Sequence, residues 1–486
     1  MKPITELQPS GIWQNFYRIT QVPRPSGFRQ PIHDFYMNCG KELGLETLTD
    51  KIGNVLIRKP ATPGYENHPG VILQAHQDMV PQKNSDKVFD FEKDPIEAYI
   101  EENGEWVTAN GTTLGADNGI GAAAALAILA DKNVQHPPIE AFFTVDEETG
   151  MYGAFALEGG FLQGKTLLNL DTEVEGEFDM GCAGGVDTTA TFTYQPVEVE
   201  EGDAAIKVTL RGLKGGHSGV DIHLQRASAN KLMFRFLKDA VANCEARLVY
   251  VNGGSLRNAI AREAEAVITV PKDGVDDIFD LVDEYETLFV KEYINKEDNI
   301  QFRAEEVECP TTEMPEDVQD FLIHAVTICP HGVYRMMDDI PGVVETSNNV
   351  AMVQTDLDKH EVTIMCLTRS AVESRKEELR QIIDSTFRLA GADVVFSGSY
   401  PGWQPNINSP IMHLMVDTYK QEFGQEPQVL TIHAGLECGI IGRNYPGMDM
   451  ISFGPTIEHP HSPDERVNIA TVAKFWQLLV ATLKKL

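Results

Sequence analysis

Basic residues are scarce in this sequence of 486 residues. Forty Lys and Arg stand against 73 Asp and Glu, which gives a formal net charge of −33. Nucleic-acid binding needs a basic surface that neutralises phosphates, and anionic membrane surfaces attract basic segments and repel acidic ones. The composition therefore argues against nucleic-acid and membrane partners. The acidity favours solubility and by itself names no partner.

Long apolar runs and a cysteine framework are also lacking. The longest stretch without charged or turn-forming residues runs from Ile120 to Ala130, interrupted only by Gly121, whereas a bilayer-spanning helix needs about 20 residues. Residues 1–10 lack the basic-then-apolar pattern of a secretory signal. The seven cysteines are odd in number, scattered, and free of any C-x-x-C motif. These features predict a cytoplasmic protein without disulfides or a thiolate zinc site.

Helix and strand patterns alternate in the first 180 residues, which indicates an α/β domain. The apolar segments 71–75, 139–145 and 166–170 predict buried strands. Between the first two, the alanine-rich segment 119–130 predicts a helix that is apolar on all sides and therefore buried against the sheet.

The pattern of apolar and polar residues changes near Val186, where segments of alternating polarity and acidic amphipathic helices begin. We interpret residues 186–397 as a second, α+β domain inserted into the first, which comprises residues 1–185 and 398–486. The sequence shows no internal repeat. A strand pattern at 449–453 resumes the texture of the first domain.

Acidic and imidazole side chains directly follow the three predicted strands of the first domain. In chain order these residues are His76 and Asp78, Glu147 and Glu148, and Asp171. In an open α/β sheet, ligands bind at the carboxyl ends of the strands. Strands of one sheet would therefore bring these side chains together.

Asp117 and His461 are further candidate metal ligands, and each also has an ordinary structural explanation. Asp117 precedes the helix 119–130, where a carboxylate is a favourable N-cap. His461 follows the strand 449–453, where a lone histidine is more often structural than a ligand. On spacing alone, His459 is an equally good candidate.

As a set, two imidazoles and three carboxylates suit Zn²⁺, Mn²⁺ or Co²⁺. A pair of ions needs one shared carboxylate and further ligands for each ion. Asp117 could bridge, with His76 and Asp171 completing one site and Glu148 and His461 the other. The sequence thus predicts a two-metal hydrolase centre, with an ordinary acidic turn at Glu147–Glu148 as the alternative.

Two remaining carboxylates lie next to these candidate ligands. Asp78 is placed to orient His76 through its ring nitrogen. Glu147 is placed to be a general base on an activated water.

Five short motifs occur in an informative order: Leu73–Asp78 (LQAHQD), Gly115–Gly119 (GADNG), Asp146–Gly150 (DEETG), Asn169–Asp171 (NLD) and His461–Glu465 (HSPDE). This order resembles the cocatalytic zinc exopeptidases that include aminoacylase and carboxypeptidase G. Five further segments carry a narrower resemblance: Met180–Gly185, Gly212–Gly219, Gly342–Ser347, Tyr400–Pro405 and His433–Cys438. Within the superfamily, the chain resembles the bacterial aminoacyl-histidine dipeptidases (peptidase D, X-His dipeptidases) over essentially its whole length.

The resemblance implies a zinc-binding α/β domain, with a central mixed sheet flanked by helices, interrupted by an inserted α+β lid domain. It implies two Zn²⁺ per subunit, with Co²⁺ or Mn²⁺ as possible substitutes, held by His76, Asp117, Glu148, Asp171 and His461. Asp117 would bridge, Asp78 and Glu147 fall on catalytic positions, and the family pattern favours His461 over His459. The resemblance also leads us to expect a cis peptide between Asp117 and Asn118.

The inserted domain would supply further residues. The resemblance implies that His217 stabilises the oxyanion and that Asn258 and Arg262 belong to a substrate-binding segment. Arg369 lies where many relatives carry an Asp-x-Arg that clamps the substrate carboxylate, but the Asp is missing here, so a structural salt bridge is the alternative. Glu437 is a candidate acceptor for a free α-amino group.

The predicted function is a cytoplasmic dipeptidase that uses two zinc ions on small dipeptides, with Xaa-His selectivity implied by the resemblance alone. Relatives commonly dimerise through the lid, so a homodimer is expected. An N-acyl amino acid deacylase with the same centre is the near alternative. A non-catalytic Ca²⁺ binder is the distant one, disfavoured because calcium avoids imidazole.

Overall fold

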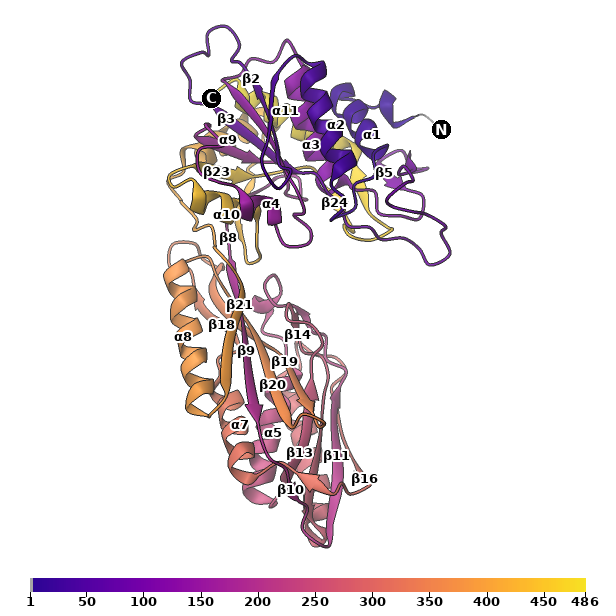
Figure 1. Cartoon of the computed structure of the whole chain (residues 1–486), viewed down its shortest axis with the longest axis vertical. Helices are drawn as coiled ribbons and strands as arrows, with labels where there is room; N and C mark the ends of the chain where they lie inside the picture. The colour runs from indigo at the N-terminus through magenta and orange to yellow at the C-terminus, as the bar shows by residue number, and fades with distance from the viewer. Residues whose placement is uncertain (1–2) are drawn as a thin grey trace. The chain divides into compact units, whose positions relative to one another are not determined.

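The computed structural model describes residues 3–486, which divide into two compact units. Unit 1 comprises the chain up to Gly181, Trp403–Thr431 and Leu436–Leu486, and unit 2 comprises Cys182–Gly402 and Ile432–Gly435. The indigo N-terminal and yellow C-terminal segments therefore belong to the same unit (Figure 1).

Unit 1 is built on an eight-stranded mixed sheet with the order β1-β2-β6-β3-β7-β23-β8-β22. Its strands are β1 (Glu46–Thr49), β2 (Val55–Lys59), β3 (Val71–His76), β6 (Ile139–Thr144), β7 (Thr166–Asn169), β8 (Glu177–Cys182), β22 (Gln428–Ile432) and β23 (Asp449–Ser452). β3 runs parallel to both β6 and β7, and β7 runs parallel to β23. The predicted strands and the mixed α/β architecture are confirmed, and the carboxyl ends of four parallel strands meet at one edge.

Helices cover this sheet and account for its apolar strands. They are α1 (Ser10–Thr20), α2 (Gln30–Glu42), α3 (Ala116–Ala130), α4 (Tyr152–Ala156), α9 (Pro410–Phe423), α10 (Glu437–Asn444) and α11 (Ile469–Leu483), with the 3₁₀ turn η1 (Ile4–Glu6). α3 packs on β3 and β6, and nearly all of its residues are buried, as its alanine-rich sequence predicted. A small antiparallel sheet joins β4 (Ala98–Ile100), β5 (Trp106–Ala109), β24 (Ile457–Glu458) and β25 (Arg466–Asn468).

Unit 2 contains one large antiparallel sheet covered by helices on one face. Its elements are β9 (Gly184–Thr193), β10 (Val197–Glu198), β11 (Asp203–Arg211), β12 (Gly216–His217), η2 (Ile222–Leu224), α5 (Ala229–Asn243), β13 (Arg247–Gly253), β14 (Ala259–Ile260), β15 (Ala264–Pro271), η3 (Lys272–Gly274), α6 (Val275–Glu292), β16 (Gln301–Val307), β17 (Thr312–Glu313), α7 (Glu316–Ile328), β18 (Gly332–Met336), β19 (Val344–Asp356), β20 (Glu361–Ser370), α8 (Glu373–Leu389) and β21 (Asp393–Tyr400). The sheet order is β16-β11-β15-β13-β19-β20-β9-β21, with β18 beside β19.

This order contains the same β-α-β-β-α-β arrangement twice. The elements β11-α5-β13-β15-α6-β16 form one copy, whose strands lie in the spatial order fourth, first, third, second. The elements β9, α7, β19, β20, α8 and β21 form the other copy with the same spatial order. The two copies meet where β13 pairs with β19. The structure thus reveals a topological repeat where the sequence showed none, because the copy that begins with β9 is interrupted by the copy that begins with β11.

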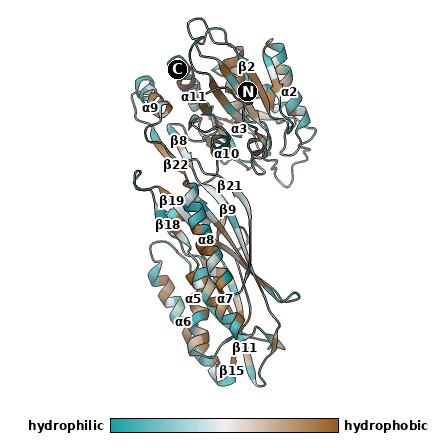
Figure 2. Ribbon diagram, turned by 60° about the vertical axis from the view of Figure 1, so that its left-hand side comes forward, coloured by the Kyte–Doolittle hydropathy of each residue, from teal (hydrophilic) through white to brown (hydrophobic). Residues whose placement is uncertain are grey.

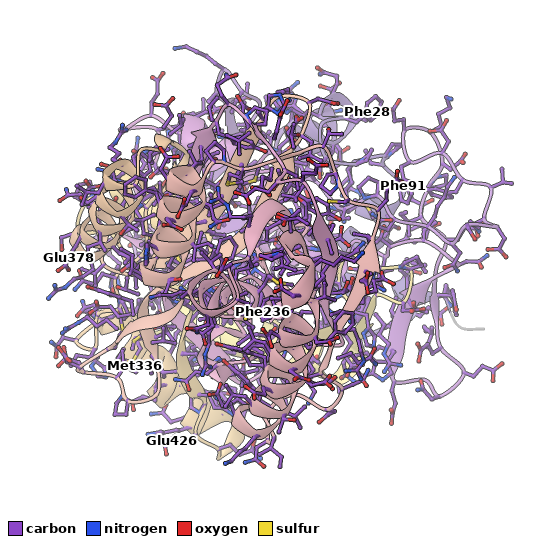
Figure 3. The ribbon with its side chains drawn as sticks, turned by 90° about the horizontal axis from the view of Figure 1, so that it is seen from below. Phe28, Phe91, Phe236, Met336, Glu378 and Glu426 are labelled. Carbon is purple, nitrogen blue, oxygen red and sulfur yellow. The ribbon has the colours of Figure 1, made fainter. Side chains whose placement is uncertain are left out.

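A single apolar core joins the two copies beneath the helices. Phe236 on α5 lies in it (Figure 3) and makes edge-to-face ring contacts with Tyr285 of α6 and Phe302 of β16. Leu379 and Phe387 of α8 belong to the same core. Much of α8 is polar on its remaining surface, whereas α3 of unit 1 is apolar after its first turn (Figure 2).

The boundaries of the units lie close to, but not at, the boundaries of residues 186–397 that were predicted from the sequence pattern. Gly184 and Gly185 already pair with β20 and β21, so the chain enters unit 2 before residue 186. It leaves after Gly402 rather than 397, and the short segment 432–435 also belongs to unit 2. Among residues 3–486, none of the helices has both the length and the apolar character needed to cross a bilayer.

Candidate metal centre

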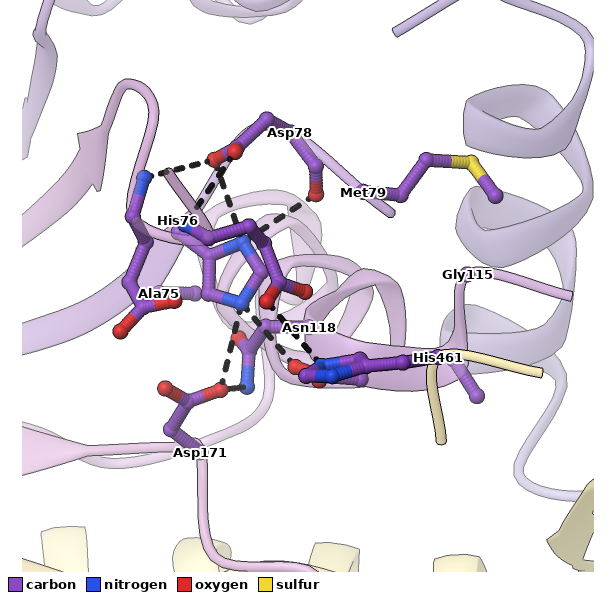
Figure 4. A network of polar contacts seen from close by, with 12 residues as sticks. Ala75, His76, Asp78, Met79, Gly115, Asn118, Asp171 and His461 are labelled. Carbon is purple, nitrogen blue, oxygen red and sulfur yellow. Dashed lines mark hydrogen bonds and ion pairs between the residues drawn. The ribbon is translucent and has the colours of Figure 1, made fainter. Parts of the chain in front are cut away.

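The candidate ligands converge at the carboxyl edge of the unit 1 sheet. His76 ends β3, Asp117 lies in the first turn of α3, and Glu148 and Asp171 follow β6 and β7. Figure 4 shows His76, Asp171 and His461 pointing toward one another. Three groups of residues could each hold an ion, because the ligand atoms of each group lie within 4.8 Å of one another. One comprises His76, Glu147 and Glu148. The other two are His76, Asp117 and Asp171, and Asp117, Glu148 and His461.

Asp117 is common to the last two groups and uses a different oxygen in each. Its Oδ1 lies 3.0 Å from His76 Nε2, and its Oδ2 lies 3.1 Å from His461 Nε2. His76 Nε2 also lies 3.6 Å from Asp171 Oδ1, and His461 Nε2 lies 3.0 Å from Glu148 Oε2. A carboxylate that points one oxygen into each of two ligand sets is suited to bridge a pair of ions.

The electrostatics of the centre favour bound cations. Burial, together with the negative charge of Asp117, raises the pKa of Asp171 to about 8. Hydrogen bonds to Asp117 and Glu148 raise the pKa of the His461 ring to about 11. The second oxygen of Glu148, Oε1, is buried without a hydrogen-bond partner among the described residues. These carboxylates and imidazoles form a donor set that suits divalent ions, since a bound cation can replace the protons that the groups hold without it.

Asp78 connects His76 to the turn that carries Glu147. His76 Nδ1 lies 3.1 Å from the Asp78 carbonyl and 3.4 Å from its Oδ1. The Asp78 carboxylate accepts hydrogen bonds from the backbone amides of Glu147, at 3.0 Å, and Glu148, at 3.4 Å. Burial raises the pKa of Glu147 well above its usual value, so this carboxylate binds a proton more readily than an exposed one.

The backbone between Asp117 and Asn118 is cis, as expected. Asn118 Nδ2 donates to the Leu170 carbonyl at 2.8 Å and makes a shorter contact with Asp171 Oδ1. The turn that carries Asp117 is thus fastened to the turn that carries Asp171.

The two candidate histidines of the 459–465 loop have different surroundings. His461 reaches Asp117 and Glu148, as described above. His459 instead lines a cavity of about 450 Å³ with Asn84, Tyr99 and Asp464. The geometry therefore brings His461, and not His459, into the ligand set.

The sequence-predicted residues of unit 2 form a second cluster. His217 Nδ1 accepts hydrogen bonds from the backbone amides of Gly219 and Val220, at 3.2 and 3.0 Å. The ring proton of neutral His217 therefore lies on Nε2, which is free to donate. Burial and the charge of Arg369 lower the pKa of His217, so the ring is neutral near pH 7.

Arg369 is buried beside this histidine. Its NH1 donates to Tyr400 Oη at 2.8 Å, and its Nε and NH2 lie 3.4 Å from Ser218 Oγ. These contacts are with hydroxyl groups, whereas the salt-bridge alternative requires a carboxylate partner. A buried guanidinium with neutral partners retains its capacity to bind an anion.

Asn258 and Arg262 lie near this cluster, and Glu437 lies in unit 1. The Asn258 carbonyl accepts a 2.7 Å hydrogen bond from the Ser218 amide, and exposed Arg262 lines a cavity of about 490 Å³. Glu437 begins α10 and is buried. Its Oε2 accepts from Gln74 Nε2 at 2.6 Å and Thr144 Oγ1 at 2.7 Å, while its Oε1 has no partner among the described residues.

A family model described as "Peptidase family M20/M25/M40" matches residues 72–485 of this sequence. The chain belongs to this family. Its members are metallopeptidases that use divalent metal ions, in agreement with the donor set of the centre.

Similar proteins cover the whole chain. The "Cytosol non-specific dipeptidase" of Escherichia coli strain K12 is 48% identical over 487 residues, covering 100% of this chain and 99% of that protein. The crystal structure of aminoacylhistidine dipeptidase from Vibrio alginolyticus is 48% identical, with a TM-score of 0.94 over 100% of this chain and 98% of that one. An aminopeptidase from Bacillus cereus shares the fold at 16% identity, with a TM-score of 0.57 over 99% of each chain.

Some residues of this peptidase centre were not predicted from the sequence. Glu465 ends the HSPDE motif, and its carboxylate accepts hydrogen bonds from four consecutive backbone amides, those of Leu114, Gly115, Ala116 and Asp117. Its place in a motif that already contained His461 was the available signal. Arg24 and Ser26 also contact the centre, and nothing in their local sequence indicated it.

Proposed function

We propose that this protein is a cytoplasmic dipeptidase that hydrolyses small dipeptides, including Xaa-His substrates, with two zinc ions per subunit. The observation that carries the proposal is Asp117, whose two oxygens face two separate ligand sets. The full-length similarity to two proteins named as dipeptidases supports the substrate class. Their names differ in specificity, so selectivity for a C-terminal histidine is a preference to be measured.

His76 and Asp171 would hold one ion, Glu148 and His461 would hold the other, and Asp117 would serve both. When bound, the two ions supply Lewis acidity, which polarises the scissile carbonyl and lowers the pKa of a water molecule. Co²⁺ and Mn²⁺ suit the same ligands. Asp78 fixes the ring orientation of His76 from Nδ1, so that Nε2 faces the centre.

Glu147 is the proposed general base. Its backbone amide is held by Asp78, which fixes the start of the turn that carries it. Burial raises the pKa of this carboxylate above its usual value, which makes it a better proton acceptor; it would take a proton from water and return it to the leaving amine. Glu148, the next residue, points to His461 instead, so the two neighbours have separate tasks.

His217 is the proposed oxyanion donor, because its Nδ1 accepts two backbone hydrogen bonds and its Nε2 carries the free proton. One such donor contributes by stabilising charge that develops only in the transition state. His217 belongs to unit 2 whereas the ligands belong to unit 1. The role therefore requires closure of the lid or donation from the lid of a second subunit.

The ends of the dipeptide would meet two opposite charges. Arg369, held by Tyr400 and Ser218, would bind the substrate carboxylate, with Asn258 and Arg262 in the same substrate-binding segment. Glu437 would bind the free α-ammonium through Oε1. Burial raises the pKa of Glu437 to about 7, and a cation beside it would favour the charged form.

We also propose that residues 186–397, the lid, mediate a homodimer. The family resemblance of the chain supports this assembly, and the cytosolic name of the Escherichia coli relative supports the location. An N-acyl amino acid deacylase remains the second candidate, since it would use the same metal centre. The buried, unpaired Oε1 of Glu437 favours the dipeptidase, because an acylated amine offers no positive charge to a carboxylate.

The test is a hydrolysis panel with metal-free protein reconstituted with Zn²⁺, Mn²⁺ or Co²⁺. The panel contains Xaa-His dipeptides, other dipeptides, and N-acetyl amino acids. We expect hydrolysis of free-amine dipeptides after metal addition and none before it. Hydrolysis of the acylated amino acids alone would establish the deacylase instead, and two-metal binding without any turnover would contradict both.

A further inference from the structure

The segment Arg24–Arg29, between α1 and α2, contacts the metal centre from outside the region that the family model matches. That match begins at residue 72. All the contacts described below lie within unit 1.

Arg24 joins two of the loops that carry candidate ligands. It is 2% exposed, and its NH1 donates to the carbonyls of Gln77, at 3.1 Å, and Asp78, at 2.6 Å. Its NH2 makes a short hydrogen bond to the carbonyl of Gly115. These carbonyls directly follow His76 and precede Asp117, so one guanidinium spans the two loops.

The glycines of the GADNG motif make room for this arginine. Gly115 adopts a left-handed conformation, with φ +69°, and a Cβ there would collide with Arg24 NH2. A Cβ at Gly119 would lie 2.9 Å from the same nitrogen. The spacing of the two glycines around Asp117 is thus explained by the guanidinium that fills the space.

Ser26, Gly27 and Arg29 hold the turn that carries Glu147 and Glu148. Ser26 Oγ donates to Asp78 Oδ2 at 2.7 Å. Gly27 donates its backbone amide to Asp146 Oδ1 at 2.8 Å, and Arg29 Nε donates to Asp146 Oδ2 at 2.5 Å. Asp146 is buried, has φ +49°, and immediately precedes Glu147.

We propose that Arg24–Arg29 is a positioning element of the metal centre. Arg24 sets the distance between the loop of His76 and the loop of Asp117, and Arg29, through Asp146, sets the direction of the turn that begins at Glu147. None of these residues touches substrate. The kinetic consequences rest on the proposed dipeptidase function, whereas the consequences for metal binding do not.

The first test is Arg24→Met, which keeps much of the side-chain volume and removes the donors. Partners that orient ligands typically contribute 10–100-fold in metal affinity, so we expect Zn²⁺ affinity, measured by competition with a chelator, to fall by about that factor. The control is Arg18→Met, because Arg18 forms an exposed ion pair with Glu42; its affinity should equal that of the parent. Parent-like affinity in Arg24→Met would overturn the role of Arg24.

The second test is Arg29→Met, with Arg29→Lys as the conservative variant. We expect Arg29→Met to keep both metals and KM and to lose about tenfold in kcat, because only the direction of the base changes. Lys retains a charge for Asp146 and should recover part of kcat. Asp146→Asn should reproduce the loss, and the double variant should be no worse than either single one.

The two tests separate this inference from the proposed function. If Arg24→Met does not fold, Arg24→Lys reports on the contacts of Arg24 with the two loops, and Ser26→Ala reports on the separate contact with Asp78 Oδ2, both through metal affinity. A parent that hydrolyses no dipeptide contradicts the proposed function, while the metal titration still decides on the positioning role. If Arg29→Met lowers thermal stability and leaves kcat unchanged, the segment is structural and the inference is wrong.

Discussion

The carboxylate of Glu465 accepts a hydrogen bond from the backbone amide of Asp117 at 3.2 Å, although 348 positions separate the two residues. Because Glu465 binds backbone amides at the start of α3, it acts as an N-cap supplied from a distant loop. The same loop carries His461. The protein therefore brings Asp117 and His461 together by its own hydrogen bonds, before any ion is considered.

Asp117→Ala should remove both metals rather than one, because a shared carboxylate serves two ions. The backbone contacts with Glu465 do not involve the Asp117 side chain, so the metal-free variant should fold as the parent does. Metal content after dialysis checks this, with Asp171→Ala as the matched control that should keep more metal. Full two-metal occupancy in Asp117→Ala would contradict the bridging role.

Glu147→Gln should bind two metals and lose turnover, since the amide keeps the shape of the side chain but cannot accept a proton. The loss of a general base costs roughly 10²–10⁴-fold in kcat. Kinetics on metal-saturated protein, beside a metal analysis of the same sample, provide the measurement. Near-parental kcat would remove Glu147 from the mechanism.

His217→Ala should leave the metals in place and change KM little. Its kcat should fall by about 10²–10³, the usual cost of one oxyanion donor. Single-turnover kinetics would separate this chemical effect from product release. An unchanged kcat would make His217 an ordinary half-buried histidine of the lid.

Glu437→Gln should discriminate between substrates with and without an α-ammonium. A hydrogen bond to a charged group contributes roughly 1.5–3 kcal/mol, which corresponds to about 10–100-fold in kcat/KM at 1.4 kcal/mol per factor of ten. The dipeptide should lose this factor, and its des-amino analogue should not. Glu173→Gln is the control, because burial raises the pKa of Glu173 to about 9; the same selective loss there would assign the ammonium site to Glu173.

Asp179 should make the stability of the metal-free protein depend on pH. Burial raises its pKa to about 6, whereas an unfolded aspartate titrates near 4. Between these values the folded state holds a proton that the unfolded state releases, so stability falls as the pH rises from about 4 to about 6. Asp179→Asn should match the parent at pH 4 and exceed it at pH 7 by roughly 2–3 kcal/mol. Denaturant unfolding at both values measures the difference, and a pH-independent difference would contradict the assignment.

Three candidate ligands could be proposed from the sequence because they lie at or just beyond strand ends: His76 ends β3, Asp171 lies two residues after β7, and Glu148 lies four residues after β6. Apolar runs locate β3, β6 and β7, and the geometry of parallel strands then brings His76, Glu148 and Asp171 together. Spacing alone did not separate His459 from His461, because both lie in one loop. The structure shows that the ring of His461 faces Asp117.

The contacts by which Arg24 and Glu465 support the metal centre could not be predicted from the sequence, and the reason is physical. Arg24 and Glu465 act on backbone carbonyls and amides, which every residue possesses, so the partner leaves no mark in the sequence. The repeated topology of unit 2 was missed for a related reason. It is recorded in the hydrogen-bonding order of the strands, and the outer copy is split by about 120 residues between β9 and α7.

The paired strands β10 and β17 mark where the inner copy leaves and rejoins the outer one. Val197 lies opposite Glu313 and Glu198 opposite Thr312, so the chain departs and returns side by side. Both connections between the copies therefore lie at one ribbon, so the chain could be cut there twice without breaking a strand of the large sheet. The inner copy would still be held in place after such cuts, because β13 pairs with β19 and the two copies share one apolar core.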